Sequence, residues 1–355
     1  KINKKYAESG RLMIIKASEV VEPARIPTGI FTLDTALDGG FPCGRWSILA
    51  GKLQSGKSTL CFRTIANAQA MGLRALYINT EARFKKEWAA QQGVNLDELM
   101  IVQLEKETSA EDITQCYIDS AMNDMADLII IDSITAMSPN REMSNPMDKE
   151  SMGLAPQVFS KFFRKATPPT TAANNRNGVC AILVAQYRDT MDQYAKEIAK
   201  VPGGNAKNSY ANYILMCSNL SPKVGVNRVS KDTGFVMGIN MLKSDNVNRG
   251  KIRLEFVDGV GIDTTSDIID SAIRLSVIEQ QGGGYYQYKD ALGEVVRVRG
   301  IKLLTDGIIS NPALIEGLRL QLEDVRKSGK MIVPLLAEDE SDEPTDKVDA
   351  VEEEV

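Results

Sequence analysis

The most constraining feature of this chain is the segment Gly51-Lys-Leu-Gln-Ser-Gly-Lys-Ser58, which fits the pattern G-x-x-x-x-G-K-[ST]. An apolar stretch at 46–50 precedes it and a helical pattern at 58–71 follows it. In this strand–loop–helix setting, backbone N–H groups and the helix N-terminus surround phosphate groups. Lys57 would neutralise the β- and γ-phosphates, and the Ser58 hydroxyl would bind Mg²⁺. The segment therefore predicts a nucleoside triphosphate site on an α/β fold. A chance match in a glycine-rich turn is the alternative, and the flanking strand and helix argue against it.

Apolar stretches alternate with amphipathic ones through the first two thirds of the chain. The expected strands cover 46–50, 75–79, 100–104, 128–132 and 179–185, and several of them are continuously apolar, as strands buried on both faces must be. The expected helices cover 58–71, 84–92, 109–125 and 153–166. Ser109 and Asp112 form a capping box at the start of the third helix. This alternation predicts an α/β fold with a mainly parallel sheet.

Two polar segments and a change of pattern organise the rest of the chain. Residues 139–151 and 187–205 are too long for ordinary connections, and such loops on a rigid scaffold usually carry function. After residue 257 we expect a turn, a helix capped by Ser266 and running to about 281, and a hairpin over 285–299. Asn311 and Pro312 then open a final helix as N-cap and first-turn proline. These elements predict a small α+β C-terminal domain.

Composition excludes several kinds of chemistry. The 355 residues include no histidine, which removes Ser-His, Cys-His and His-metal mechanisms. The five cysteines form no C-x-x-C pair and are expected to be reduced thiols. Neither a membrane span nor a signal peptide is recognisable, so we expect a cytoplasmic protein that does not contact membranes. The sequence starts at Lys1 rather than methionine, which leaves an N-terminal truncation open.

Charge is divided unevenly along the chain. Residues 338–355 hold ten acids and one lysine, so the body carries a small positive charge within a net charge of -5. An acidic tail beside a basic body is typical of a tail that competes with nucleic acid for a basic groove. A disordered tail that only improves solubility explains the charge equally well.

Two further strand ends add acidic residues to the phosphate site. Asp132 ends the apolar segment 128–132, where a carboxylate would lie beside the metal. Glu81 follows the strand at 75–79, and the C-terminal edge of a parallel sheet faces the ligand, so Glu81 could orient and deprotonate the attacking water. An ordinary strand-end cap is the alternative for Asp132, and a solvated side chain for Glu81. Together with the P-loop, they predict hydrolysis of a nucleoside triphosphate.

Several motifs in order resemble the RecA/RadA recombinase family, more closely its bacterial RecA type, including phage-encoded, UvsX-like members. The resemblance covers most of residues 10–330. The segments that carry it are 26–34, Gly39-Gly40, Met152-Gly-Leu-Ala155, Gln186, Gly203-Gly-Asn-Ala206 and Gly284-Tyr-Tyr286. It implies a RecA-type P-loop ATPase core that uses ATP and Mg²⁺.

The resemblance also implies roles for individual residues at the nucleotide. The residues matching the nucleotide site are Gly51, Ser55, Gly56, Lys57, Ser58, Thr59 and Trp88, with Ser58 and Asp132 at the metal. Glu81 matches the catalytic base, Gln186 the link from the γ-phosphate to the second DNA loop, and Lys243 a cation that reaches the neighbouring subunit's nucleotide. Trp88 would stack on adenine; an aromatic residue of the helix core is an equal alternative.

A second set of residues matches the family's contacts with single-stranded DNA. They are Ser160, Arg164, Arg188, Met191, Gly203, Gly204 and Asn205. Ser160 and Arg164 are one helical turn apart and so share a face. Met191 matches an apolar wedge between base triplets.

The chain also departs from the family pattern. The position of the second trans-acting cation holds Asp245, for which Arg249 or Lys251 could substitute, and Asn208 stands where a lysine is expected. The N-terminal oligomerisation helix is largely absent, by truncation or divergence.

We therefore expect an oligomerisation segment at 1–25, an ATPase and DNA-binding core at 26–265, a small domain at 266–337 and a disordered acidic tail at 338–355. The expected function is ATP-dependent DNA strand exchange by homo-oligomeric helical filaments, with single- and double-stranded DNA as partners. Mediator or loader proteins are further partners, and the setting is the cytoplasm of a bacterial or phage-infected cell. A RecA-core hexameric helicase and a non-catalytic recombinase paralogue are the alternatives; the C-terminal domain argues against the first, and Glu81 against the second.

Overall fold

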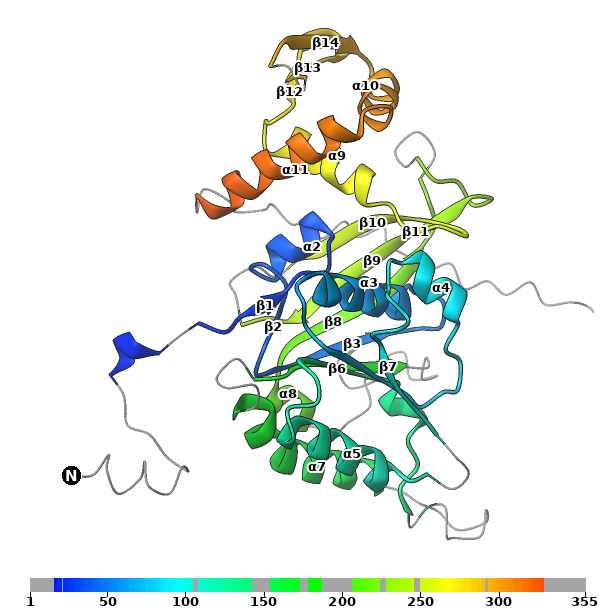
Figure 1. Ribbon diagram of the computed structural model, residues 1–355. Helices are drawn as coiled ribbons and strands as arrows, with labels where there is room; N and C mark the ends of the chain where they lie inside the picture. Colours follow the sequence, from blue (N-terminus) through cyan, green and yellow to red (C-terminus); the bar gives the residue numbers. More distant parts are fainter. Residues whose placement is uncertain are drawn as a thin grey trace, which may run out of the picture.

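A large twisted sheet, covered by helices on both faces, forms the body of the protein (Figure 1). The computed structural model describes residues 16–20, 22–104, 108–140, 142, 154–172, 178–186, 206–223, 228–245, 250–290 and 293–328. Within these residues the sheet has nine strands in the order β11-β10-β9-β8-β3-β7-β6-β4-β5.

Six neighbouring strands of this sheet are parallel. They are β3 (Arg45–Gly51), β4 (Ala75–Asn79), β5 (Met100–Gln103), β6 (Leu128–Asp132), β7 (Cys180–Gln186) and β8 (Ala211–Leu220). The five predicted strands all exist, with ends displaced by at most one residue. Most of their residues are buried because helices pack on both faces. The expected α/β fold with a mainly parallel sheet is confirmed.

The other side of the sheet is antiparallel and was not predicted. It consists of β9 (Gly234–Lys243), β10 (Lys251–Val257) and β11 (Gly261–Ile262). A separate two-stranded sheet pairs β1 (Arg25–Ile26) with β2 (Phe41–Pro42), and a 3-10 turn, η1 (Ala17–Glu19), precedes it.

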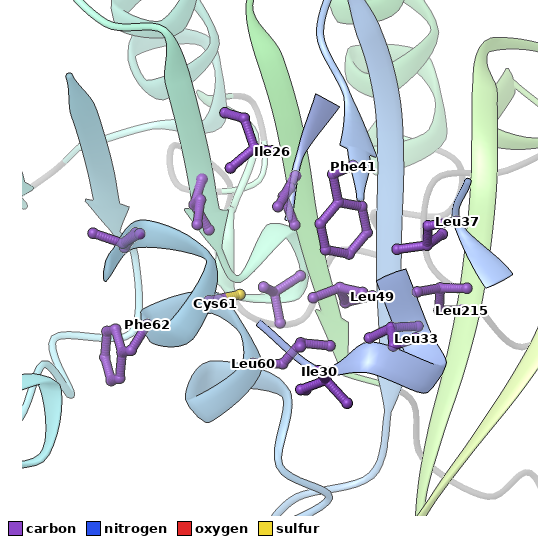
Figure 2. Packing of buried hydrophobic residues seen from close by; sticks show 14 of the residues in the cluster. Ile26, Ile30, Leu33, Leu37, Phe41, Leu49, Leu60, Cys61, Phe62 and Leu215 are labelled. Atoms are coloured by element: carbon purple, nitrogen blue, oxygen red, sulfur yellow. The ribbon is translucent and has the colours of Figure 1, made fainter. Parts of the chain in front are cut away.

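Helices on each face close a separate apolar core. On one face lie α2 (Phe31–Ala36), α3 (Lys57–Ala70) and α4 (Lys86–Gln91); on the other lie α5 (Ala110–Met122) and α7 (Leu154–Ala172). Figure 2 shows Leu60 of α3 and Leu33 of α2 packed near Leu49 of β3 and Leu215 of β8. This packing fixes the start of α3, and with it the P-loop, against the central strands.

Helix ends agree with the sequence at some places and not at others. Ser109 and Asp112 form the expected capping box of α5. The helix expected to end at 166 runs on to Ala172 through Pro168 and Pro169. Thr170 holds this added turn because its hydroxyl hydrogen-bonds to the buried Tyr117 hydroxyl at 2.7 Å.

A small α+β unit follows the sheet (Figure 1). It contains α9 (Thr264–Arg274), β12 (Glu279–Gln281), β13 (Tyr285–Lys289), β14 (Val295–Arg299), α10 (Ile301–Ile309) and α11 (Pro312–Lys327). The hairpin over 285–299 and the Asn311–Pro312 helix start are confirmed. Ser266 is not the cap of α9: Asp263 is, since its carboxylate accepts the N–H groups of Thr265 and Ser266 at 3.0 Å each. That helix also ends at Arg274 rather than near 281.

The small unit has its own core and is fastened to the sheet through α9. Phe31 of α2 joins its buried cluster with Leu304, Leu318 and Leu322. The backbone N–H of Thr32 donates to the buried carboxylate of Asp267 at 3.1 Å.

The predicted boundary at 266 and the predicted 1–25 segment remain predictions, and the tail at 338–355 lies outside the described residues. No described helix is long and apolar enough to cross a membrane.

Candidate nucleotide-binding and hydrolysis site

The P-loop connects β3 to α3, and two of its glycines are required by close packing. A Cβ on Gly51 would lie 2.3 Å from the Cys217 carbonyl oxygen of β8. Gly56 has a φ of 82°, and a Cβ there would lie 2.8 Å from the Met237 sulfur. Any other side chain would push the loop away from the sheet or strain its backbone.

Lys57 opens α3 and turns back over the loop. Its ammonium group donates to the Gly51 carbonyl at 2.9 Å, to the Lys52 carbonyl, and to the Ser55 hydroxyl at 3.3 Å. Burial lowers the pKa of Lys57, an effect opposed by the negative potential of nearby groups that include Asp132 and Glu81. The loop therefore holds a partly desolvated cation where phosphate oxygens would replace its carbonyl partners.

A hydroxyl and a carboxylate lie side by side at the metal position. The Ser58 hydroxyl donates to one carboxylate oxygen of Asp132 at 2.8 Å, and the Tyr77 hydroxyl donates to the same oxygen at 2.6 Å. Burial raises the pKa of Asp132, and these two hydrogen bonds oppose the rise. Within the described residues no group of three or more Cys, Asp or Glu side chains could hold a metal. This donor set fits Mg²⁺, which commonly takes one or two protein oxygens and completes its shell with phosphate and water.

Glu81 lies where three strand ends meet. One of its carboxylate oxygens accepts hydrogen bonds from the Ser133 hydroxyl and the Gln186 side-chain amide. Gln186 ends β7, and Thr135 holds its backbone: the Gln186 N–H donates to the Thr135 hydroxyl at 2.8 Å, and that hydroxyl donates to the Gln186 carbonyl at 3.1 Å. Because β7, β6 and β4 are neighbours, their ends bring Gln186, Asp132 and Glu81 together.

These residues line one cavity of about 1080 Å³. Of the predicted nucleotide-site residues, the cavity collects Ser55, Gly56, Lys57, Ser58, Thr59, Glu81, Trp88, Asp132 and Gln186. Trp88 is half-buried, lines the cavity and packs against the apolar core, and its stacking on adenine stays a prediction. Its indole N–H donates to the Thr59 hydroxyl at 3.1 Å, and its ring centre lies 6.4 Å from that of Phe256.

Lys243 is not part of this cavity. Lys243 pairs with Ile214 in the first half of β8. Gly51, the first residue of the P-loop, pairs with Cys217 in the second half of β8. Its ammonium group donates to the backbone carbonyls of Asn208 and Ala211 at 2.7 and 2.5 Å. Lys243 therefore lies at the opposite edge of the sheet from the P-loop of its own chain.

The substitution of Arg249 or Lys251 for the second trans-acting cation stays a prediction. The Asp245 carboxylate accepts a hydrogen bond from the Asn212 side chain. Lys251 begins β10 opposite Asn240, and Arg249 lies outside the described residues.

The predicted DNA contacts lie only partly in the described chain. Ser160 and Arg164 share one face of α7, and the Arg164 guanidinium donates to the Ser160 carbonyl at 3.2 Å. Both line a cavity of about 680 Å³ between α5 and α7, together with Lys161 and Lys165. Arg188, Met191, Gly203, Gly204 and Asn205 lie outside the described residues.

Three residues that hydrogen-bond to the candidate site residues were not predicted from the sequence. Tyr77 bonds to Asp132, Ser133 to Glu81, and Thr135 to Gln186. A signal existed for Ser133, because a hydroxyl directly after a strand-end carboxylate lies at the same sheet edge. Tyr77 and Thr135 require knowledge of which strands are neighbours.

The fold and the cavity define a P-loop nucleotide-binding core in which the Asp132 and Glu81 carboxylates line the same cavity as Lys57 and Ser58. Comparison with known families is consistent with this class: the family model for the RecA N-terminal domain matches residues 1–263. The chain is 28% identical over 326 residues to "Protein RecA" of Aquifex pyrophilus, covering 91% of this chain and 89% of the relative. It is 30% identical over 334 residues to that of Cytophaga hutchinsonii (93% and 89% covered) and 31% identical over 296 residues to that of Porphyromonas gingivalis (82% of each).

The chain therefore belongs to the RecA family. This assignment supports the recombinase over the hexameric helicase among the functions expected from the sequence.

Proposed function

We propose that this protein is a DNA-dependent ATPase that polymerises on single-stranded DNA and exchanges strands with a homologous duplex. The observation that carries the proposal is the Gln186 amide bonded to Glu81 at one end of the cavity. Gln186 is also the last residue before the segment 187–205, which the resemblance assigns to the second DNA loop. A γ-phosphate that displaces this amide would therefore act on the start of a DNA-binding segment.

The residues of the cavity divide the chemical work. Lys57 and the P-loop N–H groups bind and orient the phosphates. Ser58 and Asp132 would hold Mg²⁺, which would neutralise part of the phosphate charge when bound. Glu81 accepts a proton from the attacking water, while the Ser133 hydroxyl holds its carboxylate after the γ-phosphate has displaced the Gln186 amide. ATP binding orders the DNA loops, and hydrolysis releases them.

Lys243 is proposed to complete the site of the neighbouring subunit. Its place at the edge opposite the P-loop supports this role, because a head-to-tail assembly brings opposite edges of successive subunits together. In the filament, Lys243 would exchange the Asn208 and Ala211 carbonyls for a phosphate oxygen. We further propose a cytoplasmic setting and the participation of loader proteins.

Replacement of Lys57 by alanine is expected to weaken ATP binding by about 10- to 100-fold, because a charged hydrogen-bond partner of the phosphates is lost. The measurement is a titration with a fluorescent ATP analogue. Lys86→Ala, which removes an exposed lysine from the first turn of α4, is the matched control. Equal affinities for the two variants, both with parental melting temperatures, would contradict the phosphate role of Lys57.

Electron microscopy of the full chain with single-stranded DNA and a slowly hydrolysed ATP analogue tests the assembly. Helical filaments that need both DNA and nucleotide are expected. Closed rings would instead indicate the hexameric helicase. Filaments without ATP hydrolysis would indicate the non-catalytic paralogue.

A further inference from the structure

An arginine beside the proposed base has no role in the function derived so far. The chain turns sharply after β4: Ala82 has a φ of 53°, and the Arg83 N–H donates to the Asn79 side-chain oxygen at 3.3 Å. Glu81 and Arg83 lie on either side of Ala82 at this turn, and both line the nucleotide cavity. The position of Arg83 is therefore set by the same strand end that positions the base.

The Arg83 guanidinium is free to change partners. One of its nitrogens lies 3.9 Å from the Glu81 carboxylate, yet 71% of the arginine side chain is exposed, against 17% for the glutamate. An exposed pair at this distance contributes little stability. A phosphate is the stronger partner, because the guanidinium donates two parallel hydrogen bonds to it.

Among the described residues, the cations that line the cavity are Lys57, Arg83, Lys85 and Lys231, and Arg83 forms an ion pair with Glu81. Lys243 lies at the other edge of the sheet, and the position matching the second trans-acting cation is Asp245. Arg83 lies at the same edge of the sheet as the P-loop of its own chain, and it lines the same cavity.

We infer that Arg83 binds the γ-phosphate of the nucleotide held by its own subunit and neutralises part of its charge. This inference rests on the proposed ATPase function. When the triphosphate binds, Arg83 leaves Glu81 for the γ-phosphate oxygens, and the Glu81 oxygen that faced it becomes accessible to the attacking water. In the transition state the guanidinium stabilises the charge on the transferred phosphoryl group.

Steady-state ATP hydrolysis by the full chain on single-stranded DNA tests the role of Arg83. Arg83→Ala is expected to lower kcat by about 100-fold or more while KM changes by no more than a few-fold, because the contact strengthens in the transition state. Arg83→Lys should recover part of the rate through its charge, and Lys86→Ala, a neighbouring exposed lysine outside the cavity, should retain the parental rate. Millimolar guanidinium should restore part of the activity of Arg83→Ala and leave Lys86→Ala unchanged.

The inference fails if Arg83→Ala keeps the parental kcat, or if its loss appears in KM alone and guanidinium has no effect. In that case the proposed function would still stand if the parental chain hydrolyses ATP and the Glu81→Gln variant does not. Filaments that mix Arg83→Ala with Glu81→Gln subunits separate the two possible sites of action. A residue that acts in its own subunit gives no recovery on mixing, because every site lacks either the arginine or the glutamate. Recovery would assign Arg83 to the neighbour's site and overturn the inference.

Discussion

Filaments of Glu81→Gln subunits are expected to hydrolyse ATP at least about 100-fold more slowly than the parental chain and to persist on DNA after ATP binds. The glutamine keeps the size of the side chain but cannot accept a proton from water. Its side-chain oxygen can still accept the hydrogen bonds that Ser133 and Gln186 donate to Glu81, so the geometry around the strand ends survives. Nucleotide affinity should therefore stay close to the parental value.

Two measurements on the same variant check this expectation. ATP turnover is followed by phosphate release, and filament lifetime by the dissociation rate from labelled single-stranded DNA after dilution. Glu87→Gln is the matched control, because Glu87 is an exposed acid on the adjoining helix α4 and does not line the cavity. Parental turnover by Glu81→Gln would show that another group activates the water.

The parallel half of the sheet was predictable because most of its strands are buried on both faces. A strand such as β6 has the sequence of an uninterrupted apolar stretch that ends in Asp132, which is typical of a strand buried on both faces. The antiparallel strand β10 was not predicted because it lacks such a stretch. Lys251, Arg253 and Val257 are half-exposed, and the charged side chains of Lys251, Arg253 and Glu255 interrupt the apolar signal.

The sequence rules for helix ends failed where a tertiary contact or a stronger capping residue determined where the helix begins or ends. Prolines at 168 and 169 usually end a helix, yet the buried Thr170–Tyr117 hydrogen bond stabilises one more turn of α7. At α9, Ser266 and Asp263 are both acceptable caps. Asp263 prevails because one carboxylate accepts two backbone N–H groups and the Ser266 hydroxyl as well, at 2.6 Å.

The candidate site was predictable in its residues but not in its connections. The P-loop, Asp132 and Glu81 each carry a motif or a strand-end position that indicates a role. The order β7-β6-β4, which decides that Gln186 meets Glu81, is a property of the whole sheet. The same order brings Tyr77 to Asp132, since β4 pairs with β6 along its length.

Lys243→Ala filaments are expected to lose DNA-stimulated hydrolysis, and mixing them with inactive Glu81→Gln subunits is expected to restore part of it. Each composite site needs Glu81 from one subunit and Lys243 from the next. In a random equal mixture, about a quarter of the head-to-tail interfaces combine an intact Glu81 with an intact Lys243. Hydrolysis should therefore recover to at most about a quarter of the parental rate and pass through a maximum near equal proportions. The isolated Lys243→Ala subunit should bind ATP with parental affinity, because Lys243 lies at the edge of the sheet opposite its own P-loop.

The control for this experiment is a mixture of Glu81→Gln with Lys57→Ala. Both of these residues line the cavity of their own chain, so every site in that mixture lacks one of them, and no recovery is expected. The Lys243 side chain also bonds to the Asn208 and Ala211 carbonyls within its own chain, so its loss could act by loosening that edge of the subunit. A purely structural defect of that kind would weaken every interface in which the variant takes part, and mixing would not produce a maximum. Absence of recovery at all ratios, with filaments still formed, would place the function of Lys243 within its own subunit and remove the shared site from the mechanism.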